Sequence, residues 1–113
     1  MQRDQAILLD IYQAIELIFK YSEGVNYQDL QNNQEKQDAI LRRITIIGEA
    51  TKRLSSEFRE KHKQIPWQKI AGMRDIITHD YDEVDLEEIW TVIKVNLPEL
   101  SSYIKPLLSS DLS

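Results

Sequence analysis

The sequence contains no cysteine. This absence excludes a disulfide framework, a thiolate nucleophile and any zinc or iron–sulfur site built on cysteine ligands. Only three glycines and three prolines interrupt the 113 residues, so long helices can form without breaks. No apolar run approaches the ~20 residues that a membrane-spanning helix needs, and the first residues lack the basic and then apolar pattern of a signal peptide. We therefore expect no membrane association and a cytoplasmic protein.

The residues that are present describe a folded chain. Hydrophobic residues make up 42% and charged residues 29% of the sequence, which is typical of a globular protein. The length suffices for one domain with its own core. We expect a single domain over residues 1–113, with a frayed tail at 109–113.

The charge is unevenly distributed. The net charge of −5 disfavours broad, non-specific wrapping of nucleic acid, yet residues 36–74 carry ten Lys and Arg against four Asp and Glu. This segment includes Arg42, Arg43 and Arg53, which could form a path for RNA or could belong to helix faces that pair with acidic ones. Charge alone favours the second interpretation.

Apolar residues recur with helical spacing along almost the whole chain, which predicts an all-α protein. The expected elements are a helix over about 3–21, a short helical turn at 26–30, the longest helix over about 32–63, a helix from Pro66 onward and a last helix over 86–104. Leu86 and Trp90 belong to the apolar stripe of that last helix. We predict an up-and-down bundle of four main helices plus the short turn.

Local signals mark where these helices begin and end. Gly24 supplies a stop after the first helix. Asn32 and Glu35 have the spacing of a capping box at the start of the longest helix. Pro98 should kink the last helix or restart it near Asn96. His62 lies near the end of the longest helix, where it suits the helix dipole, and we assign it a structural role.

Two adjacent residues within the longest helix stand out. A glycine inside a helix costs about 1 kcal/mol relative to alanine, so Gly48 predicts the close approach of another helix. Glu49 places a carboxylate in an apolar run. It either finds a partner in Arg74 or His79 of the neighbouring helix, or it is simply exposed to solvent, and the sequence leaves both possibilities open.

The segment from Arg74 to Tyr81 contains a guanidinium, an imidazole, a phenol and two carboxylates. If the helix continues, Arg74, Thr78 and Tyr81 share one face and Asp75 can orient the His79 ring. If the helix ends near His79, the turn of the chain could instead bring the imidazole toward the guanidinium. Either arrangement can gather these groups around one phosphate.

Such a cluster suits the cleavage of RNA without a metal. The arginine fork matches phosphate oxygens and can hold charge that builds in the transition state. The histidine can take the 2′-hydroxyl proton or deliver one to the leaving oxygen at neutral pH, which would leave a 2′,3′-cyclic phosphate. One histidine with scattered acids is a poor metal site, and we expect no cofactor. The alternative is an ion-pair network that caps a helix, and spacing alone favours this structural interpretation.

Several separate segments agree in order and spacing with one known family. They are Ile46–Ala50, Ile65–Trp67, Gly72–Arg74, His79–Tyr81, Trp90 and Leu97–Leu100. With them the chain resembles, over nearly its whole length, the HEPN superfamily. Within it the chain is most similar to the HepT-like toxins that are encoded beside a nucleotidyltransferase antitoxin of the MntA type. The R-x4-H-x-Y motif of these toxins is complete.

The resemblance implies a HEPN-like helical bundle that forms a homodimer, with the two motif copies facing a shared cleft. It implies a metal-independent ribonuclease toxin in which Arg74 and His79 are the catalytic pair. Asp75, often Asn in relatives, would help to position His79 or substrate. Tyr81 would receive AMP from the partner nucleotidyltransferase, which adds bulk and negative charge where substrate phosphate must bind.

Two other functions remain compatible with the sequence. The chain could be a non-catalytic nucleotide-binding or substrate module that acts through its complex with the nucleotidyltransferase. It could also be a purely structural helical dimer, although the intact motif argues against this. Growth arrest that requires His79, when the chain is expressed without its partner, would distinguish the ribonuclease from both.

Overall fold

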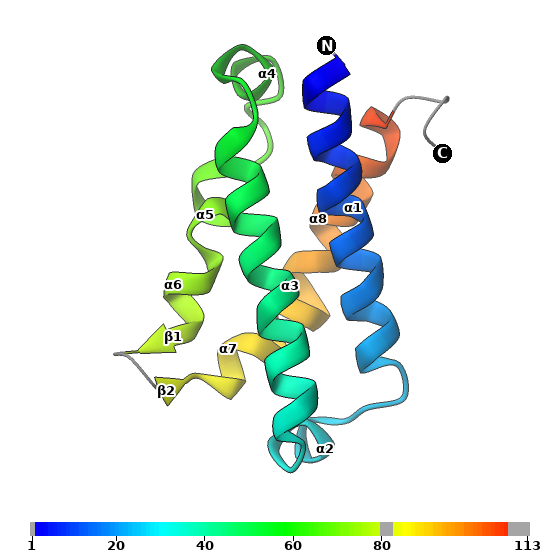
Figure 1. The fold of residues 1–113 in the computed structure, drawn as a ribbon, viewed down its shortest axis with the longest axis vertical. Coiled ribbons are helices and arrows are strands. Elements are labelled where there is room, and N and C mark those ends of the chain that lie inside the picture. The colour runs from blue at the N-terminus through cyan, green and yellow to red at the C-terminus, as the bar shows by residue number, and fades with distance from the viewer. Residues whose placement is uncertain (1, 80–82, 109–113) are drawn as a thin grey trace.

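The computed structural model describes residues 2–79 and 83–108. Four helical runs stand side by side and alternate in direction (Figure 1). They are α1 (Gln2–Ser22), α3 (Gln34–Arg53), the pair α5 (Trp67–Ala71) and α6 (Met73–Ile77), and the run α7 (Leu86–Thr91), η1 (Val92–Asn96) and α8 (Leu97–Ile104). The predicted all-α, up-and-down bundle is confirmed.

Short elements connect these runs. The single turn α2 (Tyr27–Gln31) joins α1 to α3 at one end of the bundle, and α4 (Ser56–Lys61) joins α3 to α5 at the other (Figure 1). Two short strands, β1 (Thr78–His79) and β2 (Glu83–Val84), lie between α6 and α7, and the 3₁₀ turn η2 (Lys105–Leu107) follows α8. None of the described helices is both long enough and apolar enough to cross a membrane.

The core lies between the four runs and is made almost entirely of aliphatic side chains. Among the described residues, the large side chains with no more than trace exposure are Leu8, Ile11, Ile15, Ile18, Leu30, Ile40, Ile44, Ile47, Ile65, Ile77, Ile89 and Leu97. Leu86 and Trp90, which we expected to be buried, are half-buried. Trp90 instead meets the Tyr27 ring edge-on at 5.9 Å between centroids and lies 4.7 Å from the Lys94 ammonium.

The first connection follows the sequence signals closely. After α1, Gly24 adopts a left-handed conformation with φ +70°, which a residue without Cβ adopts at no steric cost. Asn26 then caps α2, because its side chain accepts from the Asp29 N–H at 2.8 Å while its own N–H donates to the Asp29 carboxylate at 3.1 Å. This reciprocal pair is a capping box that sequence analysis did not identify.

The capping box predicted at Asn32 and Glu35 is wrong by one residue. Asn33 is the N-cap of α3, and its side-chain oxygen accepts from the Lys36 N–H at 2.9 Å. Asn32 instead ends α2, where its N–H donates to the Gln28 carbonyl. Two successive asparagines can each cap a helix, and here the short helix α2 uses the first of them.

The predicted helix over 32–63 is also interrupted, so that α1 and not α3 is the longest helix. The break falls at Leu54 and Ser55, where the backbone becomes extended. The buried Asp4 carboxylate of α1 accepts hydrogen bonds from the Ser55 N–H at 2.9 Å and from the Ser55 hydroxyl at 2.8 Å. The Ser55 hydroxyl in turn accepts from the Phe58 N–H at 3.0 Å and so caps α4.

His62 has a structural environment, as expected. It ends α4, its ring lies 4.5 Å from the Phe58 ring, and its carbonyl accepts from the Trp67 indole at 3.0 Å. Pro66, expected in the first helical turn, is instead the N-cap of α5. The apolar stripe that follows is confirmed, because Trp67, Ile70, Met73 and Ile77 are all buried, although a break at Gly72 separates α5 from α6.

The last helical run departs from regular α-helix directly before Pro98. Helical backbone angles persist from α7 through η1 into α8, but η1 is a π-helix. The Leu97 N–H donates to the Val92 carbonyl, five residues back. Proline has no N–H and its ring crowds the preceding turn, and the wider π turn accommodates it within a continuous helical run.

Candidate functional site

The segment from Arg74 to Tyr81, which carries the candidate site, is helical only as far as Ile77. Helix α6 ends at Ile77, and β1 pairs in antiparallel fashion with β2, with Thr78 opposite Val84 and His79 opposite Glu83. The Asp85 N–H donates to the Ile77 carbonyl at 2.7 Å and closes this hairpin. The continuous-helix arrangement is therefore wrong, and the chain turns at this point.

Thr78 stabilises the end of α6. Its backbone N–H and its hydroxyl both donate to the Arg74 carbonyl, the hydroxyl at 2.7 Å. The backbone of His79 follows directly, so the hairpin fixes where the main chain of His79 begins relative to Arg74. For His79 the structure describes the backbone alone, and Tyr81 lies outside the described residues.

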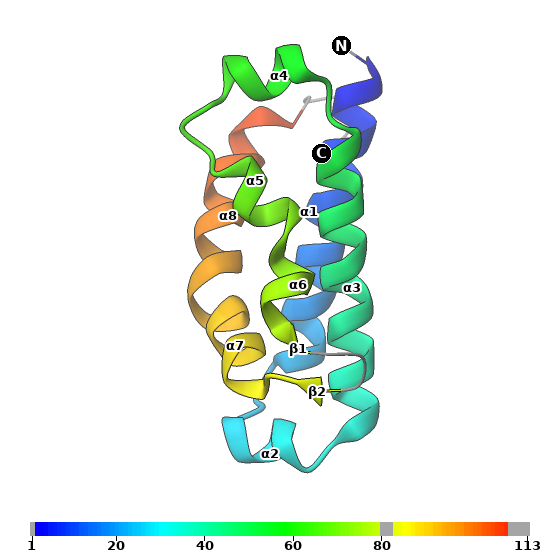
Figure 2. The ribbon, with the colours of Figure 1, turned by 90° about the vertical axis from the view of Figure 1, so that its left-hand side faces the viewer.

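Arg74 is exposed on α6, while its neighbours Met73 and Ile77 are buried in the core. The buried residues hold α6 against the bundle and direct Arg74 and Asp75 toward a hollow between α3 and the α5–α6 pair, which run side by side (Figure 2). This hollow, with a volume of about 490 Å³, is lined by Asp38, Leu41, Arg42, Thr45, Gly48, Glu49, Lys52, Ala71, Arg74 and Asp75. We call it the α3–α6 hollow.

The floor of the α3–α6 hollow depends on Gly48. A Cβ added there would lie 3.0 Å from the Ala71 carbonyl oxygen and 3.7 Å from the Ile70 carbonyl oxygen. The predicted close approach of another helix is thus confirmed, and the helix is α5. Because α5 ends at Ala71, this contact also sets where α6, and with it Arg74, begins.

The charges that line the hollow balance one another. Three cations, Arg42, Lys52 and Arg74, stand among three carboxylates, Asp38, Glu49 and Asp75. All six side chains belong to exposed residues. Glu49 is exposed, and among the described side chains no ion pair joins it to Arg74. The other predicted partner, the His79 side chain, lies outside the described part of the chain. Within the described part of the chain, no group of three or more His, Cys, Asp or Glu could hold a metal ion.

The three arginines of the predicted RNA path do not all lie at the α3–α6 hollow. Arg42 lines the hollow, but Arg43 and Arg53 do not, and Arg53 lies 3.9 Å from the Asp10 carboxylate of α1. Lys52 lines the hollow and was missed by sequence analysis. Its signal was available, because Lys52 follows Arg42, Thr45 and Glu49 at the spacing of a single helix face.

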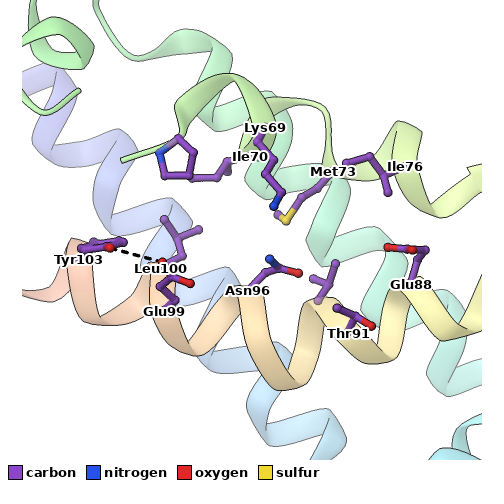
Figure 3. A pocket seen from close by; sticks show the side chains of 12 residues that line it. Lys69, Ile70, Met73, Ile76, Glu88, Thr91, Asn96, Glu99, Leu100 and Tyr103 are labelled. Carbon is purple, nitrogen blue, oxygen red and sulfur yellow. Dashed lines mark hydrogen bonds between the residues drawn. The ribbon is translucent and has the colours of Figure 1, made fainter. Parts of the chain in front are cut away.

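A second hollow lies on the other side of the α5–α6 pair (Figure 3). Its volume is about 250 Å³, and its lining is largely apolar, with Ile70 and Met73 facing Leu100 across it. At its rim, the Tyr103 hydroxyl donates to the Glu99 carboxylate at 3.3 Å, and Ile76 is 42% exposed. Helix α6 thus carries Arg74 toward one hollow and Ile76 toward the other.

Comparison with known proteins identifies the family. The family model described as "Ribonuclease HepT-like" matches residues 11–107, which include the whole hairpin and every residue that lines the α3–α6 hollow. The chain belongs to the HepT-like ribonuclease family. HEPN superfamily membership follows, and no solved structure matches the HepT-like chain significantly.

Similar proteins carry ribonuclease names. A Methanocaldococcus jannaschii protein named "Gamma-glutamylcyclotransferase and putative RNase" is 43% identical over 96% of this chain, which spans 49% of that relative. A "Putative RNase" of Caldanaerobacter subterraneus is 37% identical over 98% of this chain and 99% of its own length. A "Probable ribonuclease HepT" of Thermococcus cleftensis is 36% identical over 88% of the HepT-like chain and 91% of its own.

Proposed function

We propose that this HepT-like chain is the toxin of a toxin–antitoxin pair and a metal-independent endoribonuclease. The observation that carries the proposal is the position of Arg74, which is exposed at the rim of a hollow in a chain of the ribonuclease family. The hairpin places the backbone of His79 directly after the helix end that Thr78 closes. Arg74 thus lies in α6, and the backbone of His79 follows the C-terminal end of the same helix.

In the proposed reaction the 2′-oxygen of a ribose attacks the adjacent phosphorus. The 2′-hydroxyl loses its proton, the bond from phosphorus to the 5′-oxygen of the next nucleotide breaks, and that oxygen takes up a proton. His79 exchanges one of these protons, for which an imidazole is suited near neutral pH. Arg74 binds the phosphate oxygens and stabilises the charge that builds on them. The products are a 2′,3′-cyclic phosphate and a 5′-hydroxyl.

The proposal includes a homodimer and a partner. Two copies of the chain would bring their motifs to a shared cleft. A nucleotidyltransferase of the MntA type would silence the toxin by transferring AMP to Tyr81, with the phenol oxygen attacking the α-phosphorus of ATP and pyrophosphate leaving. The AMP group would then occupy the space of the substrate phosphate and repel it.

Expression in bacteria without the nucleotidyltransferase tests this proposal. We expect the wild-type chain to arrest growth and the Arg74→Ala and His79→Ala variants to be harmless at equal protein level. His62→Ala is the matched control, because this other histidine packs against Phe58 away from the hollow, and it should remain toxic. Co-expression of the nucleotidyltransferase should rescue growth for the wild type but not for Tyr81→Phe. Arrest by the His79→Ala variant, or none by the wild type, would contradict the proposal.

A further inference from the structure

Helix α3 presents two pairs of adjacent cations that the fold separates. Arg42 and Lys52 line the α3–α6 hollow together with Arg74. Arg43 and Arg53, each the next residue along the chain, lie outside it. Arg43 is half-buried and Arg53 faces Asp10 of α1. The sequence offers four similar charges, and the helix directs two of them toward the candidate site.

The two cations in the hollow are well spaced for an extended ligand. Ten residues of α-helix separate Arg42 from Lys52, a rise of about 15 Å along the axis. Arg74 extends into the hollow from the opposite wall, since α5–α6 packs along α3 at the Gly48 contact. Three cations on two walls therefore line one continuous space, and a single phosphate cannot reach both ends of it.

The neutral balance of the lining limits what the hollow can hold. Asp38, Glu49 and Asp75 offset the three cations, so attraction depends on contacts at particular positions and not on a broad positive field. Duplex nucleic acid carries twice the phosphate charge per unit length of a single strand, and the carboxylates repel it correspondingly more. Single strands also leave base edges free, whose amino groups can donate to carboxylates.

We propose that the α3–α6 hollow binds single-stranded RNA, with Arg42 and Lys52 holding phosphates on either side of the one at Arg74. This inference rests on the proposed ribonuclease function, because it assigns the substrate strand of that same site. Arg42 and Lys52 are positioning residues here. They fix the register of the strand, and the reacting groups are Arg74 of α6 and His79 of β1.

The test compares two double variants that have the same change in charge on the same helix. The first, Arg42→Ala with Lys52→Ala, removes the cations inside the hollow. The second, Arg43→Ala with Arg53→Ala, removes their immediate neighbours outside it. The probe is a single-stranded 2′-O-methyl RNA oligonucleotide, which lacks the attacking hydroxyl and stays intact, and its dissociation constant is measured as a function of salt. Thermal unfolding checks that both variants are folded.

We expect the Arg42 and Lys52 variant to bind about tenfold more weakly, because each exposed charge contact to a phosphate contributes only a few-fold to affinity. The slope of log affinity against log salt should fall by about 1.4, at ~0.7 per phosphate for single strands. The Arg43 and Arg53 variant should bind as the wild type does. Equal weakening in both variants, unchanged binding in the first, no binding by the wild type, or tighter binding of a duplex of the same length would each overturn the inference.

The result separates the inference from the proposed function. If the wild type cleaves RNA and the two double variants bind the oligonucleotide equally well, the proposed ribonuclease function is retained and the proposed RNA-binding role of Arg42 and Lys52 is wrong. If the wild type does not cleave RNA but the first double variant alone loses binding, the strand-binding hollow stands and the catalytic proposal fails.

Discussion

Gly48 of α3 and the carbonyl of Ala71 approach so closely that a Cβ at position 48 would lie 3.0 Å from the carbonyl oxygen. This contact joins the helix that lines one wall of the α3–α6 hollow to the start of the helix that carries Arg74 on the other. Since backbone carbonyls cannot move as side-chain ends can, any side chain at position 48 must separate the two walls.

Substitution of Gly48 by alanine should therefore affect the site more than the fold. In Gly48→Ala, the gain in helix propensity of about 1 kcal/mol opposes the crowding at Ala71, so we expect a small change in Tm but weaker RNA binding. Gly48→Leu should destabilise the fold by several kcal/mol, beyond the ~1–3 kcal/mol typical of overpacking. Gly72→Ala is the control, because a Cβ there meets its nearest atom, the Gln68 carbonyl oxygen, at an ordinary 3.6 Å. Equal RNA binding by Gly48→Ala and wild type would contradict this role.

Glu49 should weaken the binding of phosphate by the hollow. Its carboxylate is exposed among Arg42, Lys52 and Arg74, where it repels a polyanion. Glu49→Gln keeps the shape of the side chain and removes the charge, so RNA binding should become several-fold tighter at low salt and the difference should shrink as salt screens it. Glu16→Gln makes the same charge change on α1, away from this hollow, and should leave affinity unchanged. Weaker binding by Glu49→Gln would show instead that the carboxylate contacts the substrate.

Thr78 should matter to activity beyond its contribution to stability. Its hydroxyl donates to the Arg74 carbonyl at 2.7 Å, and Thr91 on α7 makes the same kind of bond to the Glu87 carbonyl at 3.0 Å. Thr78→Val and Thr91→Val should each cost about 1 kcal/mol or less of unfolding free energy. Only Thr78→Val should lower the rate of RNA cleavage, because only that bond holds the end of α6 beside His79. Equal cleavage rates in the two variants would show that Thr78 does not contribute to the candidate site.

Asp4 should make the fold sensitive to acid. Burial on its own would raise the pKa of Asp4, but the hydrogen bonds from the Ser55 N–H and hydroxyl, with the charge of Arg3 nearby, hold the pKa below its ordinary value of 3.8. A carboxyl whose pKa is lower in the folded state stabilises the fold fully above 3.8, and this stability is lost as the pH falls through the folded-state pKa.

Chemical unfolding as a function of pH measures this contribution. Asp4→Ala should lower the unfolding free energy by about 2–3 kcal/mol near neutral pH, because it leaves the Ser55 donors without their charged acceptor. The deficit should be constant from about pH 5 to 7 and shrink below about pH 4. Asp10→Ala removes only an exposed ion pair with Arg53 and should change stability by about 0.5 kcal/mol or less at every pH. A deficit independent of pH would show that Asp4 acts through packing alone.

Much of the fold follows from local patterns in the sequence. The spacing of apolar residues predicts all four helical runs, Gly24 marks the end of α1, and Asp85 caps α7 by accepting from the Glu88 N–H at 3.1 Å. Gly48 predicts the close approach of a neighbouring helix, and Pro98 predicts a distortion of the last run. Each of these signals can be recognised from one residue and its neighbours in the sequence.

Several features that sequence analysis missed depend on contacts between different elements of the fold. The break between α3 and α4 is stabilised by Asp4, 51 residues away from Ser55, so no local pattern marks it. The end of α6 at Ile77 depends on pairing with a strand and on the Asp85 N–H. Likewise, Arg42 lines the hollow and Arg43 does not, because α5–α6 packs against only one face of α3. The functions of Arg74, His79 and Tyr81 remain predictions.

Cleavage of RNA by Arg74 and His79 can be measured directly with purified protein. Wild type, Arg74→Ala and His79→Ala are incubated with cellular RNA in EDTA, thermal unfolding confirms that all three are folded, and the product ends are identified. We expect cleavage by the wild type alone, with 2′,3′-cyclic phosphate and 5′-hydroxyl ends. Equal cleavage by all three proteins, or cleavage by none of them, would contradict it.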